Sequence, residues 1–375
     1  MPLWRAEIWP PDSFEAEALY LRPIDLMGGA SGRAACKAGA AQSLAGGPLA
    51  FRNVELIARG AAGVCAWQAS LREVREWAEE RGGYAAKRIV QLESNLTNAR
   101  SPFANISLDH PHLFGILNVT PDSFSDGGDY IDPDRAIAHG GFLTKEGAAI
   151  VDIGGESTRP GAEPVGVEEE IARVLPVIIE IASQGAIISI DTRHADVMAA
   201  ALDAGARVLN DVTALTHESA SLALATERRA PVVLMHKQGD PRTMQDAPDY
   251  DDVVLDIFDY LEARVTACEE AGIVRGNLCV DPGIGFGKTL GNNLEILGKL
   301  SLFQGLGTAV MVGVSRKSFL SHTHPGLKPK ERLAASIAAG LGCLNQGVQF
   351  LRVHDIPESA QALRVWLALR NGENR

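Results

Sequence analysis

The sequence has few cysteines and no long apolar run, and each shortage excludes a class of protein. Five cysteines among 375 residues, widely spaced and without a CxxC or Cys/His pattern, predict reduced packing residues rather than disulfides or cysteine-bound metal. No stretch of about 18 apolar residues occurs, so we expect no membrane span. The first residues lack a charged leader followed by an apolar core, which predicts no signal peptide and a cytoplasmic protein.

Positive charge is also scarce. The formal net charge is −12, and because acidic and basic residues balance before residue 110, the acidic excess lies wholly in the rest of the chain. Nucleic acid is therefore not an expected partner, and an anionic ligand would need a local cationic pocket. With 46% hydrophobic residues, the chain is long enough for one large domain and a smaller one.

From residue 111 onward, apolar runs and amphipathic stretches alternate eight times. The runs are Leu113–Val119, Ala148–Ile153, Ala186–Ile190, Arg207–Asn210, Pro231–Met235, Leu278–Val280, Thr308–Val314 and Phe350–Val353. The stretches are Pro133–Glu146, Val167–Ser183, Ala195–Ala204, Ser219–Arg228, Val253–Ala271, Leu294–Leu300, Glu331–Gln346 and Pro357–Arg370. This alternation predicts an α/β protein with a (β/α)8 barrel over residues 111–375, and a doubly wound sheet is the alternative.

Residues 1–110 show no such alternation. We expect a small α/β or helical appendage, with a strand at Ala18–Pro23, a helix over Trp67–Arg81 and a linker at Ser101–His112. The sequence indicates no activity for this extension.

Each of the eight apolar runs is followed by polar residues, and in a barrel such positions surround the active site. One buried aspartate could be a structural cap, but eight polar ends at one mouth favour a binding site. Four side chains suit a flat heterocycle with an amidine-like edge: Asp191, Asn210, Asp281 and Lys317. Arg159, Arg352 and His354 suit phosphate oxygens. Asn118 offers a neutral oxygen to Mg²⁺.

A phosphate-binding P-loop is excluded at Gly287-Lys288-Thr289. The pattern GxxxxGK[ST] needs glycine at position 282, which is proline here. We expect the glycines of residues 283–287 to allow close approach of a flat ligand, and Lys288 to be solvated.

The motifs ILNVTPDSFSDGG, DIGGESTRPGA, SIDT, LNDVTA, MHKQG, DPGIGFGKT, GVSRKSF and RVHD, in this order, resemble those of the dihydropteroate synthase family. The resemblance runs from about Phe114 to the C-terminus. It implies a (β/α)8 homodimer that condenses 6-hydroxymethyl-7,8-dihydropterin diphosphate with 4-aminobenzoate, releases pyrophosphate with Mg²⁺, and is a target of sulfonamides.

The resemblance also implies a role for each site residue. Asp191, Asn210, Asp281 and Lys317 would hold the pterin, Arg159, Arg352 and His354 the diphosphate, and Asn118 the Mg²⁺. Thr158, Pro160 and Ser318 would border the aminobenzoate, and Met235, Gly285 and Phe286 would wall the ring slots. Asp191, Lys317, Arg352 and His354 are the expected catalytic residues, and loops Thr120–Tyr130 and Glu156–Val167 would close over them.

The sequence departs from the family motifs at two places, and three alternative functions stay open. Arg193-His194 stands where the family usually has Tyr-Lys or similar, and MHKQG replaces MHMQG; we expect both to alter only the rim of the site. A folate-dependent methyltransferase would not need STRPG, SRKS and RVHD together. The other two alternatives are a catalytically silent pterin-binding protein and a chain with a second activity in residues 1–110.

Overall fold

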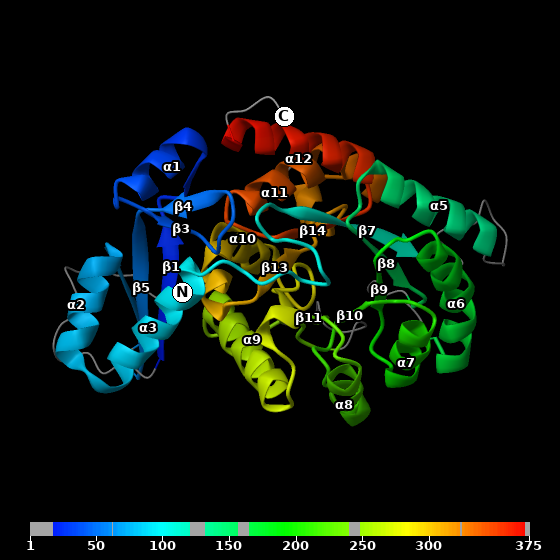
Figure 1. Cartoon of the computed structure of the whole chain (residues 1–375), viewed down its shortest axis with the longest axis horizontal. Helices are drawn as coiled ribbons and strands as arrows, with labels where there is room; N and C mark the ends of the chain where they lie inside the picture. Colours follow the sequence, from blue (N-terminus) through cyan, green and yellow to red (C-terminus); the bar gives the residue numbers. More distant parts are fainter. Residues whose placement is uncertain are drawn as a thin grey trace.

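The computed structural model describes residues 18–61, 63–120, 132–156, 165–239, 248–322 and 325–371. Within these residues, eight parallel strands close into a barrel, and helices cover its outside (Figure 1). The last strand of the chain pairs with the first strand of the barrel, so the sheet has no free edge. The predicted (β/α)8 fold is confirmed, and the doubly wound alternative is excluded.

The barrel strands match the predicted apolar runs to within a few residues. They are β7 (His112–Asn118), β8 (Ile150–Gly154), β9 (Ile188–Asp191), β10 (Val208–Asp211), β11 (Val232–Met235), β12 (Leu278–Asp281), β13 (Ala309–Val312) and β14 (Phe350–Val353). Most of their residues are buried, because one face fills the barrel and the other packs against helices. The register pairs Asn118 with Gly154 and Gly154 with Asp191, so the carboxyl ends meet at one mouth.

The helices follow the strands as predicted, with one clear error. They are α5 (Pro133–Glu146), α6 (Val167–Ser183), α7 (Ala195–Asp203), α8 (Ser219–Arg228), α9 (Val253–Glu270), α10 (Leu290–Gly298), α11 (Leu333–Leu344) and α12 (Ile356–Asn371), with 3-10 segments η1 (Arg275–Asn277), η2 (Leu300–Leu306), η3 (Ser318–His322) and η4 (Pro329–Arg332). The expected start at Leu294 was wrong because Thr289 and Asn292 form a capping box that begins α10 four residues earlier. No described helix is long and apolar enough to cross a membrane.

The extension is a small α/β unit, as predicted. Strands β1 (Ala18–Ile24), β5 (Asn53–Gly60) and β6 (Gly63–Ala69) form one antiparallel sheet, and β2 (Met27–Gly28), β3 (Gln42–Ser43) and β4 (Leu49–Phe51) form another, with helices α1 (Gly29–Lys37), α2 (Leu71–Arg81) and α3 (Gly83–Thr97). Trp67 was wrongly placed in a helix. It lies in β6, paired with Leu56, and the helix begins only after Ser70, whose side chain forms a capping box with Glu73.

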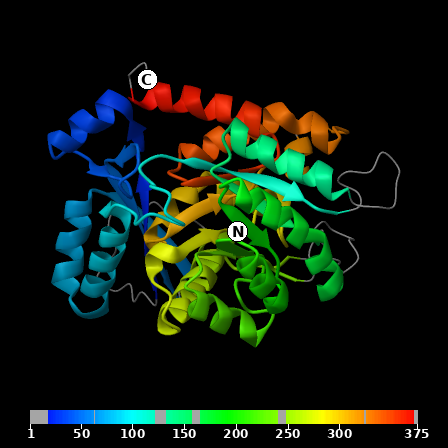
Figure 2. The same cartoon turned by 45° about the vertical axis from the view of Figure 1, so that its right-hand side comes forward.

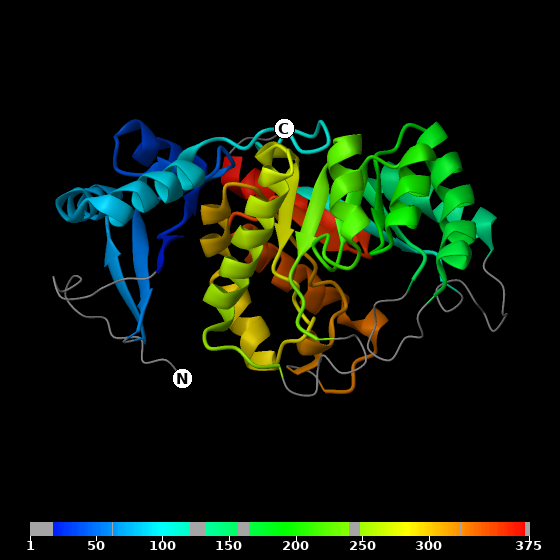
Figure 3. The ribbon, with the colours of Figure 1, turned by 90° about the horizontal axis from the view of Figure 1, so that it is seen from below.

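The extension packs along one side of the barrel, against α9 and η2 (Figure 3). Helix α1 also lies beside the end of α12, as two views agree (Figures 1 and 2). Tyr20 donates a hydrogen bond of 2.9 Å to Asp259 in α9, and Arg88 forms a two-pronged pair with Glu262 at 2.6 and 3.0 Å. The buried residues of the extension and of the barrel helices belong to one continuous hydrophobic cluster.

The segment expected to be a linker closes the amino end of the barrel. Phe103 and Leu108 are buried there with Phe114 and Phe350, and the ring centroids of Phe103 and Phe350 lie 5.6 Å apart, edge to face. His112 already belongs to β7. The segment is therefore part of the barrel core, at the end opposite the mouth.

Candidate active site

A network of buried and half-buried polar groups lies toward the carboxyl ends of four strands. The guanidinium of Arg352 in β14 donates from Nε to Asp152 at 2.6 Å and from Nη2 to Asp191 at 2.6 Å. The same oxygen of Asp152 accepts a 3.0 Å hydrogen bond from the amide of Asn210. Strands β8, β9, β10 and β14 thus bring together two carboxylates, one amide and one guanidinium, which a flat polar ring can meet with both donors and acceptors.

A second group comes from the ends of β12 and β13. Asp281 is buried and accepts a 2.7 Å hydrogen bond from the backbone of Gly283. The Nζ of Lys317 donates to the carbonyl of Ile284 and lies 4.7 Å from the ring centroid of Phe286. Lys317 and Phe286 are each partly exposed, so an ammonium and an aromatic face border the same opening.

The glycines after β12 have a structural role that the sequence did not indicate. Gly283 has φ +69°, and a Cβ there would stand 1.9 Å from the carbonyl of His236; Gly287 has φ +65°, and its Cβ would stand 2.3 Å from the carbonyl of Gln238. Larger residues are excluded by the neighbouring loop after β11 as well as by the backbone conformation. Gly285, at φ +84°, faces Lys317 instead, with 3.5 Å between its Cβ position and the lysine Cδ.

Lys288 was expected to be solvated, and this was wrong. It is only 2% exposed, with its Nζ 2.9 Å from Nδ1 of His236 and 3.0 Å from the carbonyl of Phe286. Burial lowers the pKa of Lys288 to about 7, and burial beside Lys288 lowers the pKa of His236 to about 3, so the imidazole is neutral. The lysine thus joins the loops after β11 and β12.

Burial also shifts the pKa of the groups that face the mouth. It raises the pKa of Asp191 to about 7, although Arg352 opposes the rise. It lowers the pKa of Lys317 to about 8, although Asp281 opposes the fall. Asp281 itself has a raised pKa because of burial, partly offset by Lys317. Titratable groups whose pKa values are shifted toward neutral pH are typical of functional sites.

The other predicted residues lie around this centre. Asn118 is partly exposed at the end of β7, Met235 is 5% exposed at the end of β11, and His354 follows β14 with its Nδ1 3.1 Å from the hydroxyl of Ser315. Ser318 is exposed and begins the 3-10 segment η3. Thr158, Arg159 and Pro160, and most of the two loops expected to close the site, lie outside the described residues.

Two features of the network were missed. Asp152 begins the DIGGESTRPGA motif but was assigned no role, yet it is fully buried between Arg352 and Asn210, and its second oxygen has no hydrogen-bond partner among the described residues. Arg352 was grouped with the phosphate-binding cations, whereas its guanidinium here spans Asp152 and Asp191. The sequence signal for Asp152 was an aspartate in an apolar run, two residues before a pair of glycines. No local signal indicated the pairing of Arg352 with the two aspartates.

Comparison with known proteins agrees with this geometry. Residues 114–354 match the family described as "Pterin binding enzyme". The dihydropteroate synthase of Escherichia coli K12 is 44% identical over 262 residues, which is 70% of this chain and 92% of that protein. Two solved structures of the Xanthomonas albilineans dihydropteroate synthase cover 70% of this chain. The one with 4-aminobenzoic acid has TM-score 0.66, 46% identity and 94% of that chain covered; the one with 7,8-dihydropteroate has TM-score 0.64, 42% identity and 95% covered.

The barrel, its polar mouth and the matched segment together define a pterin-binding enzyme of the (β/α)8 class. Within that class, the chain belongs to the dihydropteroate synthase family. The matched segment begins at residue 114, so the extension lies outside it.

Proposed function

We propose that the network at the barrel mouth is the pterin site of a working dihydropteroate synthase. The chain condenses 6-hydroxymethyl-7,8-dihydropterin diphosphate with 4-aminobenzoate, forming 7,8-dihydropteroate and pyrophosphate. The observation that carries the site assignment is the joint placement of Asp191, Asn210 and Arg352 at the ends of three strands. Asp152 connects them.

The pterin ring is held by the two polar groups on either side of the mouth. Asp191, when ionised, accepts two N–H bonds from the amidine-like edge of the ring, and Asn210 and Asp281 add neutral and charged partners. Arg352 positions the carboxylates of Asp191 and Asp152 because it donates to both. Lys317 donates to a ring acceptor after leaving the carbonyl of Ile284.

The second substrate and the diphosphate take the outer part of the mouth. We assign Phe286 and Met235 as walls of the pterin and aminobenzoate slots and Ser318 as part of the border of 4-aminobenzoate. The family motif alone assigns Thr158 and Pro160 to the same border. From the family motifs, we assign Arg159 and His354 to the diphosphate, while Arg352 stays paired with Asp152 and Asp191. Cationic and hydrogen-bonding groups at this position stabilise the charge that develops on the leaving pyrophosphate.

Asn118, the remaining polar residue of the rim, is a suitable ligand for Mg²⁺. Asn118 offers a neutral amide oxygen at the end of β7, partly exposed, which is a ligand type that Mg²⁺ shares readily with phosphate oxygens. When bound, Mg²⁺ supplies neutralisation of phosphate charge. The protein groups then do the rest: the C–O bond breaks, the carboxylate of Asp191 stabilises the cationic pterin methylene, and the held amine forms the C–N bond and loses its proton.

The proposal includes a cytoplasmic homodimer. All five cysteines are free thiols, three of them buried, as expected of packing residues in a reducing compartment. Sedimentation of the purified chain would test the dimer, since a monomer at working concentration would remove that part of the proposal.

The decisive measurement is pyrophosphate release with the pterin diphosphate, Mg²⁺ and 4-aminobenzoate. We expect release that requires aminobenzoate and that a sulfonamide inhibits competitively. Lys317→Ala should lower kcat/KM by about 100-fold or more, because it removes a charged donor from the mouth of the barrel. Lys330→Ala, an exposed lysine on η4, is the matched control and should leave turnover unchanged.

A catalytically silent pterin-binding protein is the second candidate. Tight pterin binding without release, in the wild-type chain, would move the protein to that class. Release without dependence on 4-aminobenzoate would contradict both candidates.

A further inference from the structure

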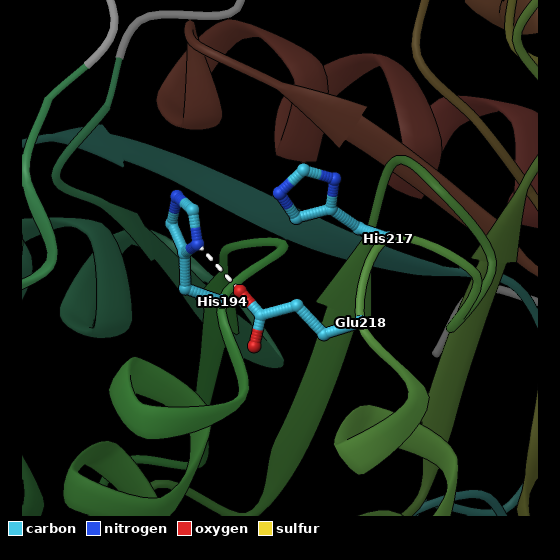
Figure 4. Close-up of side chains that lie close together, drawn as sticks. All are labelled: His194, His217 and Glu218. Carbon is cyan, nitrogen blue, oxygen red and sulfur yellow. Dashed lines mark hydrogen bonds and ion pairs between the residues drawn. The ribbon is translucent and has the colours of Figure 1, made fainter.

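Three potential metal ligands gather at the rim of the barrel, beside the active site but separate from it. His194 follows β9, and His217 and Glu218 follow β10 (Figure 4). One ligand atom from each lies within 4.8 Å of the other two. Among the described residues, no other group of three histidine, cysteine or acidic side chains is arranged in this way.

The carboxylate of Glu218 is already positioned. One oxygen lies 2.8 Å from Nδ1 of His194, and the other accepts a 3.0 Å hydrogen bond from the backbone of Ala195, the first residue of α7. Both oxygens are therefore engaged, which fixes the orientation of the carboxylate at the rim. A bound cation would replace the proton shared by His194 and Glu218, while the hydrogen bond from Ala195 remains to orient the carboxylate.

The backbone of the loop that carries His217 is held in place by hydrogen bonds. The buried carboxylate of Asp211 accepts hydrogen bonds from the backbone of Thr213 at 2.7 Å and of Leu215 at 2.9 Å. The hydroxyl of Thr213 in turn accepts one from the backbone of His217 at 3.3 Å. The side chain of His217 is exposed, so its ring can turn while its backbone stays in place.

A simple ion pair between His194 and Glu218 would explain two of the three residues, but not the third. The rings of His194 and His217 lie 5.2 Å apart, nearly perpendicular, with Arg193 close by. Two neutral imidazoles and a carboxylate are the ligand set of three-ligand zinc sites with an open fourth position.

We propose that His194, His217 and Glu218 form a binding site for Zn²⁺ or a similar transition-metal ion, with water as the fourth ligand. Tetrahedral Zn²⁺ with bonds of about 2.0–2.1 Å needs ligand atoms roughly 3.3 Å apart, and rotation of the exposed His217 ring closes the present spacing. Nitrogen ligands favour Zn²⁺ over Mg²⁺, so this ion is distinct from the one expected at Asn118. The ion would join the loops after β9 and β10, three and seven residues beyond Asp191 and Asn210. The proposal does not depend on the proposed function.

The test uses the full-length chain, freed of metal with a chelator and titrated calorimetrically with Zn²⁺ alone. We expect one ion per chain, and a higher melting temperature in its presence. His217→Ala and Glu218→Gln should each weaken binding by more than about 100-fold, since loss of a ligand costs more than loss of its support. His110→Ala, an exposed histidine at the opposite end of the barrel, should bind as the wild type does.

Cobalt(II) gives an independent measurement of the ligands. Bound at this site it should show the intense visible bands of a tetrahedral ion without the ultraviolet charge-transfer band of a thiolate. Unchanged zinc binding by His217→Ala, no binding by the wild type, or a thiolate band indicating the partly exposed Cys36 or Cys65 would each overturn the proposal. His217 is exposed, so its alanine variant should fold, and unaltered melting without zinc would verify this.

Discussion

At the scale of single residues, the mouth of the barrel holds more buried charge than a stable fold needs. Asp152 and Asp191 share one guanidinium, and a third carboxyl, Asp281, faces Lys317. Removing charges from water is costly, and pairing offsets this only in part. A polar ligand therefore gains most binding free energy where these groups still lack a hydrogen-bond partner, because it completes hydrogen bonds that the protein leaves open.

This arrangement predicts a bell-shaped dependence of pterin affinity on pH. Burial raises the pKa of Asp191 to about 7, so its carboxylate is lost as the pH falls through that value. Burial lowers the pKa of Lys317 to about 8, so its ammonium is lost as the pH rises through that value. Affinity, measured by calorimetry between about pH 5 and pH 9, should be highest between the two.

The variant Asp191→Asn distinguishes the acidic limb of this pH profile from the alkaline limb. It should weaken pterin binding by about 10- to 100-fold, as expected for a lost charged hydrogen bond of about 1.5–3 kcal/mol, and abolish the acidic limb alone. A flat profile for the wild type, or an acidic limb that survives in the variant, would contradict the assignment of Asp191.

At the scale of elements, local chemistry explains where helices begin, and packing explains what the connecting segment does. Helix α10 begins at a capping box that the sequence contains, Thr289 with Asn292, but a count of apolar residues overlooks it. The segment after α3 has two prolines and polar residues and thus reads as a linker. Phe103 and Leu108 bury only because the closed barrel offers them a hole at its amino end.

Truncating Phe103 should therefore destabilise the whole barrel. Phe103→Ala leaves a cavity beside Phe114 and Phe350, and we expect a loss of about 3–5 kcal/mol in the free energy of unfolding. Urea unfolding measures it. Phe142→Ala, at an exposed position on α5, should cost less than about 1 kcal/mol. Turnover of the folded variant should be normal because Phe103 lies opposite the mouth; a loss of less than about 1 kcal/mol would refute the packing role.

At the scale of the whole molecule, the extension and the barrel share one hydrophobic cluster. Tyr20, Arg59 and Arg88 also bond to carboxylates of α9 across the boundary. The division at residue 110 stays a prediction about domains, but this interface predicts that the two parts unfold together. An extension that only tethered a partner would not need so extensive a contact.

The tryptophans allow a direct test of joint unfolding. Trp67 and Trp77 lie in the extension, whereas Trp366 is on α12. In Trp366→Phe, fluorescence reports the N-terminal region alone, while far-ultraviolet circular dichroism is dominated by the barrel helices. We expect the two urea transitions to coincide. An earlier fluorescence transition would mean that the extension unfolds independently and that the interface contributes little.

The sequence by itself determined the alternation of strands and helices, because burial of short apolar runs and the period of helical faces are local properties. It also placed polar residues at every strand end, and hence the residues that we propose for the pterin site. Only the tertiary structure decided their pairing: Arg352 with Asp152 and Asp191, Lys288 with His236, and His194 with Glu218. Arg352 is up to 200 residues from its partners and meets them only when the last strand closes against the first, whereas the other two pairs form between the loops of neighbouring strands; none of these contacts leaves a trace in local pattern.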